Sequence, residues 1–159
     1  MSAENKSYIP LVLLILAFLG IGSVIGSLTM KEVDIWYSTL NRSPLTPPNY
    51  IFPVAWTILY AMIATSGWLI WRASFFPQLR LIKSLYVIQL LLNWSWTPLF
   101  FRYHLTGLSL LSLFIMNSVV FLIIYLSYER IKWVPLFMTP YLVWILFAAY
   151  LNFYVFQYN

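Results

Sequence analysis

The stretch "IPLVLLILAFLGIGSVIGSLTM", residues 9–30, contains no charged residue. A helix needs about 20 consecutive apolar residues to cross the hydrocarbon core of a bilayer, and this stretch is long enough. It is longer than the apolar segment of a secretory signal peptide, and further apolar stretches follow it. We therefore expect a membrane-spanning helix here rather than a cleaved leader.

Four more apolar stretches follow along the chain of 159 residues, of which 62% are hydrophobic and 8% are charged. This composition is typical of an integral membrane protein. Because the later connections are short, neighbouring helices should run antiparallel. The sequence predicts an all-α membrane protein, a single domain over residues 1–159 that forms a five-transmembrane-helix bundle. Its spans are expected at residues 9–30, 52–71, 80–100, 106–127 and 134–156.

The connection between the first two spans, residues 31–51, is the longest one. Pro44, Pro47 and Pro48 lie in it, and it has few apolar residues. Proline lacks a backbone N–H and breaks helices, so we expect an extended, stiffened loop here rather than another helix.

Lysine and arginine are distributed unequally between the two ends of the predicted bundle. Cytoplasmic loops usually carry the excess of positive residues. The count therefore predicts a protein of the cell membrane with a cytoplasmic N-terminus and an external C-terminus. The net charge of +5 is spread over the loops, which favours lipid headgroups rather than nucleic acid as the partner. The cations on the N-terminal side are Lys6, Arg72, Arg80, Lys83, Arg130 and Lys132; those on the other side are Lys31, Arg42 and Arg102.

Several kinds of chemistry are excluded or disfavoured by the residues present. The chain has no cysteine, so it forms neither disulfides nor iron–sulfur clusters. No nucleophile–base pair, carboxylate pair or metal-ligand cluster is evident, and no intrinsic cofactor or metal is expected. The acidic residues lie outside the apolar stretches, whereas proton-coupled transporters usually keep one at membrane depth. The single histidine, His104, fits an interfacial position better than axial ligation of a haem iron.

Eight tryptophans and twelve tyrosines are more than usual for this length. Trp68, Trp71 and Trp133 fall at the N-terminal side and fit an aromatic belt at the headgroup level. The others gather toward the opposite side, together with amide side chains that a belt does not require. This second group consists of Trp36, Tyr37, Trp56, Tyr60, Trp94, Trp96 and Trp144, with Ala148, Leu151 and Asn152 near Trp144 on the last span.

The segment "NWSWTP", residues 93–98, places the carboxamide of Asn93 about 10 Å inside the third span. Gln89 and Asn93 are four residues apart and share one helix face. An unpaired amide in hydrocarbon costs several kcal/mol, so Asn93 must face the interior of the bundle. There it either bonds a neighbouring helix or serves as the polar anchor of an aromatic-lined small-molecule pocket, with residues 31–51 as a lid.

Three longer segments resemble the translocator-protein family, also called TspO or tryptophan-rich sensory proteins. They are "WYSTLNRSPLTPPNYIFPVAWTILYAM", "LNWSWTPLFF" and "PYLVWILFAAYLNFYVF", and they follow one another in the family's order from Trp36 to Phe156. Because the chain has no organelle-type N-terminal extension, we expect a bacterial member. The resemblance implies a five-helix bundle, commonly a homodimer, with a pocket beneath the first loop. Gly22 and Gly26, four residues apart, would permit close helix approach within the chain or between copies.

The resemblance also implies ligands and site residues. Family members bind protoporphyrin IX or haem, sterols in some lineages, and isoquinoline carboxamide or benzodiazepine drugs. Two departures stand out: Leu108 replaces a tryptophan of the pocket, and Gln157 replaces the arginine of the animal sterol motif, which puts sterol binding in doubt. Loose cholesterol-contact patterns, such as "LSYER" at residues 126–130, decide nothing. The implied ligand-binding residues are Trp36, Tyr37, Trp56, Tyr60, Asn93, Trp94, Trp96, Leu108, Trp144, Ala148, Leu151 and Asn152.

The resemblance to bacterial members implies a membrane protein that binds a tetrapyrrole and promotes its light-dependent oxidative degradation. Indole is readily oxidised, so Trp56 and Trp144 are the candidate electron donors, while Arg42 or Arg102 could meet the propionates. The chemistry itself would belong largely to the pigment. A transporter of tetrapyrroles and a ligand-responsive sensor are the alternatives. The inverted repeats and broken helices of many carriers are not evident.

Overall fold

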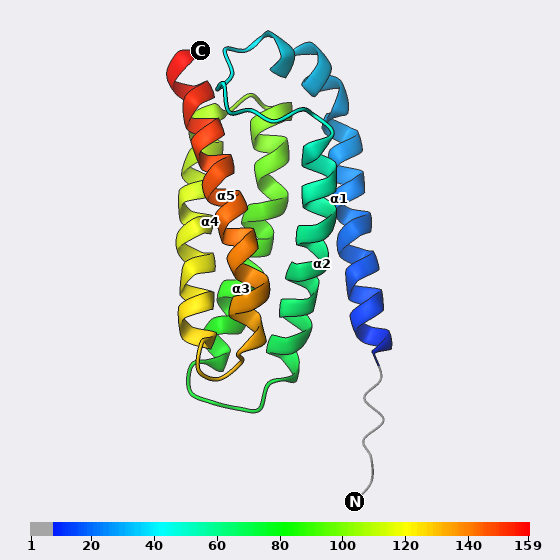
Figure 1. Cartoon of the computed structure of the whole chain (residues 1–159), viewed down its shortest axis with the longest axis vertical. Coiled ribbons are helices and arrows are strands. Elements are labelled where there is room, and N and C mark those ends of the chain that lie inside the picture. The colour runs from blue at the N-terminus through cyan, green and yellow to red at the C-terminus, as the bar shows by residue number, and fades with distance from the viewer. Residues whose placement is uncertain (1–7) are drawn as a thin grey trace, which may run out of the picture.

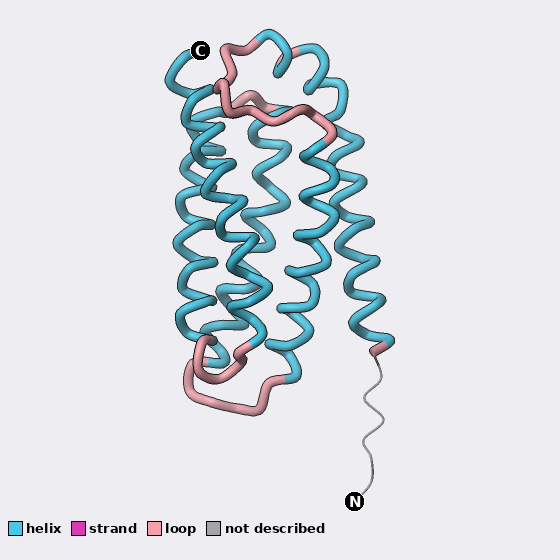
Figure 2. Tube along the Cα trace, viewed as in Figure 1, coloured by secondary structure: helices cyan, strands magenta, loops and turns pink. Residues whose placement is uncertain are grey.

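Five long helices and two short helical turns make up residues 8–159. The structure is a computed structural model that describes residues 8–159. In this part of the chain no strand forms, and Figures 1 and 2 show the helices side by side. The elements are α1 (Ile9–Ile35), the 3-10 turn η1 (Tyr37–Thr39), α2 (Ile51–Arg72), α3 (Leu79–Thr97), the π-helical turn η2 (Pro98–Arg102), α4 (Thr106–Ser127) and α5 (Trp133–Tyr158).

Consecutive helices run antiparallel, as the short connections predict. α4 packs against both α3 and α5, and α2 packs against both α1 and α5. α1 lies at the edge of the bundle, with only Phe18 and Thr29 buried along its length. The connection after α1 crosses the end of the bundle at which α5 ends (Figure 1). This end is called the loop end below, and the opposite one, where α1 begins, is called the N-terminal end.

The five predicted spans coincide with the five helices to within a few residues, with one correction. Residues 31–35 belong to α1, although we expected loop from residue 31 onward. The helix continues because no proline or glycine occurs before Pro44, and the N–H of Trp36 still bonds the carbonyl of Glu32 at 3.0 Å. The irregular part of this connection runs from residue 40 to residue 50.

Four of the helices are long and apolar enough to cross a membrane, namely α1, α2, α4 and α5. α3 is less apolar because Arg80, Lys83, Gln89 and Asn93 interrupt it. Gln89 and Asn93 are nevertheless buried against the other helices, so α3 is an integral part of the bundle. A five-helix bundle is therefore observed. That α3 also crosses the membrane stays a prediction.

The glycine pair of α1 has two different environments. A Cβ atom at Gly22 would overlap the ring of Tyr60 on α2, whereas one at Gly26 would meet no atom within 4 Å. Gly22 therefore permits close packing of α1 on α2 within one chain. Gly26 takes no part in this contact.

Replacing Gly22 with alanine should lower the thermal stability of the protein, because the added methyl group would overlap the buried Tyr60 ring. Overpacking of this kind costs about 1–3 kcal/mol. Thermal unfolding of the purified protein in detergent measures the loss. Gly26→Ala is the matched control, and equal losses in the two variants would contradict the packing role of Gly22.

Candidate ligand-binding site

A chain of buried hydrogen bonds connects three helices in the middle of the bundle. The hydroxyl of Tyr60 on α2 donates to Asn93 Oδ1 on α3 at 3.1 Å. Asn93 Nδ2 donates to the hydroxyl of Tyr141 on α5 at 2.9 Å, and that hydroxyl lies 3.1 Å from Gln89 Oε1. Asn93 thus makes the interhelical bonds that were one of its two expected roles. Both ends of its amide are already bonded.

Tyr141 is the central residue of this network, and it was missing from the predicted site. It is fully buried and also contacts Met116 Sδ on α4 at 3.2 Å. A signal for it exists in the sequence. Tyr141 precedes the buried Ile145 by four residues and therefore lies on the inward stripe of α5, where a phenol needs a partner.

Different aromatic rings pack against Trp56, Trp94 and Trp144 in the structure. Trp56 packs on Tyr60, with ring centroids 5.4 Å apart, and lies edge-on to Tyr141 at 6.5 Å. Trp94 lies edge-on to Phe18 of α1 at 5.7 Å, and its buried Nε1 has no hydrogen-bond partner. The aromatic neighbours of Trp144 are Phe52 and Phe147. All three indoles pack against one hydrophobic core, and a hollow shared by them stays a prediction.

Trp144 lines an apolar groove of about 340 Å³ between α2 and α5. The ring of Trp144 lies edge-on to Phe52 at 6.1 Å and is tilted against Phe147 at 6.0 Å. The side chains at the rim are exposed, so the groove opens toward the surroundings of the bundle. A flat apolar ligand could therefore reach Trp144 directly from a membrane. The walls include Ala55, Ile58 and Met62 from α2 and Val143, Trp144 and Phe147 from α5.

The other predicted site residues have separate environments. Trp96 donates through Nε1 to Asn152 Oδ1 at 3.2 Å, and this oxygen also accepts from the Ser109 hydroxyl at 2.9 Å. These contacts tie α3, α4 and α5 together near the loop end. Leu151 is buried and Ala148 is half-buried against the core. Leu108 is 50% exposed on α4, outside both the buried network and the α2–α5 groove.

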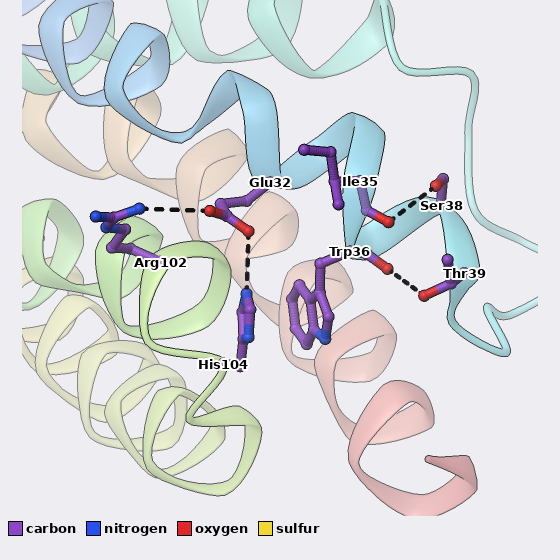
Figure 3. A network of polar contacts seen from close by, with 7 residues as sticks. All are labelled: Glu32, Ile35, Trp36, Ser38, Thr39, Arg102 and His104. Carbon is purple, nitrogen blue, oxygen red and sulfur yellow. Dashed lines mark hydrogen bonds and ion pairs between the residues drawn. The ribbon is translucent and has the colours of Figure 1, made fainter.

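A polar cluster fastens the end of α1 to the segment after α3 (Figure 3). The carboxylate of Glu32 lies 3.4 Å from Arg102 Nη1 and 3.3 Å from His104 Nε2. Trp36 stacks on the His104 ring with centroids 4.0 Å apart, and His104 has a left-handed backbone with φ of 54°. Ligation of a haem iron by Nε2 would require breaking the contact with Glu32.

The loop at residues 40–50 is also fastened to the end of α5. Asn41 accepts and donates hydrogen bonds with Asn159, at 3.2 and 2.9 Å. The hydroxyls of Ser43 and Tyr150 are 2.9 Å apart. The guanidinium of Arg42 lies over the buried ring of Tyr37, 5.2 Å from its centroid. This loop crosses the loop end of the bundle (Figure 2), and its role as a lid stays a prediction.

Removing the phenol oxygen of Tyr141 should destabilise the bundle. Tyr141→Phe leaves Asn93 Nδ2 and Gln89 Oε1 without their partner, which costs about 1–2 kcal/mol in a membrane bundle. Thermal unfolding in detergent is the measurement. Tyr125→Phe is the control, because the Tyr125 ring is 69% exposed. A Tyr141→Phe variant as stable as this control would show that the network contributes nothing.

Neutralising Glu32 should loosen the lid. Glu32→Gln weakens the contacts to Arg102 and His104, and a loss of about 1 kcal/mol corresponds to about fivefold faster opening. Amide hydrogen exchange over residues 36–50 measures this opening. Asp34→Asn, a change at an exposed carboxylate two residues away, should leave the exchange unchanged. Identical exchange in Glu32→Gln and the unaltered chain would contradict the fastening role.

Comparison with known proteins assigns the family. The model of the TspO/MBR family matches residues 11–158. A "Tryptophan-rich protein TspO" of Archaeoglobus fulgidus is 36% identical over 95% of this chain and 97% of its own length. A "Tryptophan-rich sensory protein" of Cereibacter sphaeroides is 30% identical over 90% of this chain and 87% of its own. The "Translocator protein" of Bos taurus is 30% identical over 87% of this chain and 84% of its own. With its apolar helices, the chain is therefore a multi-pass membrane protein that belongs to the TspO/MBR family.

Proposed function

We propose that this protein binds a tetrapyrrole such as protoporphyrin IX or haem within the membrane and promotes its light-dependent oxidative degradation. The observation that carries the proposal is the apolar groove between α2 and α5, in which Trp144 is accessible. A tetrapyrrole ring is flat and apolar, and aromatic side chains bind such rings through large buried area and offset stacking. A tetrapyrrole is larger than the groove, and the part that does not fit inside extends through the open side of the groove.

The propionates of the bound pigment point toward the loop end in this proposal. Phe147 in the groove stacks with Tyr150 at 6.4 Å, and the Tyr150 hydroxyl contacts Ser43, the neighbour of Arg42. In the described part of the chain Arg42 has no carboxylate partner, whereas Arg102 is paired with Glu32. Of the two arginines considered from the sequence, Arg42 is therefore the one that is available to a propionate.

Trp144 serves as the first electron donor and Trp56 as the second. The indole gives one electron to the illuminated pigment, which leaves an indole radical cation and a pigment radical anion. Dioxygen then adds to this anion through a new C–O bond, and cleavage of the resulting peroxide opens the ring. Trp144 lines the groove, so its ring can contact the pigment. Trp56 lies one layer further in, against Tyr60 and Tyr141. The protein supplies binding and donors, and the pigment supplies the photochemistry.

The same groove suits the flat aromatic rings of isoquinoline carboxamide or benzodiazepine drugs. Transport of tetrapyrroles is the second candidate function, favoured by the opening of the groove along two helices toward the membrane. A homodimer and a ligand-responsive sensor role remain predictions from the resemblance. We also place the N-terminal end on the cytoplasmic side of the cell membrane, because Arg72, Arg80, Lys83, Arg130 and Lys132 lie there.

Replacing Trp144 with phenylalanine should weaken protoporphyrin binding about fivefold and slow the light-dependent loss of its absorption, because an aromatic contact contributes about 1 kcal/mol. Fluorescence titration and absorption spectroscopy under illumination are the measurements. Trp56→Phe should slow the photoreaction with little effect on binding.

Trp133→Phe is the matched control, since Trp133 is exposed at the N-terminal end, far from the groove. Unchanged binding and bleaching in Trp144→Phe would contradict the site. Flux of the pigment into sealed vesicles in the dark, without bleaching in the light, would favour transport instead.

A further inference from the structure

A second hollow lies at the N-terminal end of the bundle, where α4 ends and α3 begins. Its volume is about 490 Å³. Gln78, the residue before α3, forms one side, and Tyr125, Glu129 and Arg130 contribute to the other. The proposed tetrapyrrole groove is lined by α2 and α5 and shares no residue with this hollow.

Two opposite charges, Glu129 and Arg130, line this hollow. Within residues 8–159, neither Glu129 nor Arg130 takes part in an ion pair or a side-chain hydrogen bond, and the ion pairs that do form there involve Glu32 at the loop end. A carboxylate and a guanidinium side by side are complementary to a ligand that carries one positive and one negative group. A phosphate suits arginine, because the guanidinium donates two parallel hydrogen bonds to it.

The wall below these charges is apolar and follows the axis of α4. Phe121 and Ile124 line the hollow beneath Tyr125. Phe114 and Phe121 are seven residues apart on one face of α4, and both are more than half exposed. Tyr125 and Tyr128 are also exposed at the end of this face, as is typical of aromatic side chains at the headgroup level. A ligand with a charged head and a long apolar tail fits this surface.

We propose that the hollow binds a phospholipid with a phosphoethanolamine headgroup. Its phosphate bonds Arg130, its primary ammonium donates to the carboxylate of Glu129, and an acyl chain lies along Phe121 and Phe114. The carboxylate of Glu129 disfavours headgroups with a net negative charge. A choline headgroup cannot replace the ammonium, because a quaternary nitrogen has no N–H to donate.

Native mass spectrometry of the full chain in mild detergent tests this assignment. The probes are phosphatidylethanolamine, phosphatidylcholine and phosphatidylglycerol with identical acyl chains. The unaltered protein should retain phosphatidylethanolamine about fivefold better than the other two, which corresponds to about 1 kcal/mol. Glu129→Gln should abolish the preference over phosphatidylcholine, whereas Arg130→Gln should weaken the retention of phosphatidylethanolamine about fivefold.

Two further variants separate the hollow from general surface attraction. Ile124→Trp fills the hollow and leaves its charges in place, so it should also reduce lipid retention. Lys132→Gln removes a cation at the same end of the bundle that does not line the hollow, and it should have no effect.

Four results would overturn the proposal. The first is equal retention of the three lipids, and the second is an equal loss of retention in Arg130→Gln and Lys132→Gln. The third is competition by glycerophosphoethanolamine as strong as that of the intact lipid, which would mean that the acyl chain plays no part. The fourth is a protein dimer that dissociates in Ile124→Trp, which would mean that a second copy covers this face.

Discussion

The buried hydroxyl of Tyr141 is the interaction on which the arrangement of the helices depends. It joins α5 to Asn93 and Gln89 of α3 and to Met116 of α4, and Asn93 extends the connection to Tyr60 of α2. An unpaired amide in hydrocarbon costs several kcal/mol, so α3 must keep this face inward. The network thus explains how α3, the least apolar helix, packs in the bundle. The same hydrogen bonds fix the rotation of α2 and α5 relative to α3.

This fixed interior determines where a ligand can bind. Asn93 has both ends of its amide bonded, and Trp96 and Asn152 bond each other, so these polar groups serve the bundle. Trp144 instead faces the groove between α2 and α5. The connection after α1 is fastened at Glu32 and at Asn41. The proposed ligand site therefore lies at the periphery of the bundle rather than at its centre.

The helices could be predicted from the sequence because long charge-free stretches have few alternatives to membrane-spanning helices. The end of α1 was wrong by five residues, since the polar residues that follow Met30 do not end the helix, which continues to Ile35. Helix spacing also correctly placed Gln89 and Asn93 on one face. Spacing alone does not reveal which neighbour a face meets, because that depends on how each helix is rotated. For this reason Trp94 was not assigned to Phe18 of α1. Leu108 was named because the resemblance implies that position, and Tyr141 was missed although its spacing from Ile145 indicates an inward position.

We propose that an illuminated pigment lies against Trp144 and takes an electron from it. Peptide mapping by mass spectrometry after brief illumination of the protein with protoporphyrin IX tests this claim most directly, because it identifies the indole that has lost electrons. The account predicts oxidation at Trp144 before any other tryptophan, although Trp71 and Trp133 are 51% and 61% exposed. Oxidation that begins at these two residues, with Trp144 intact, would contradict it.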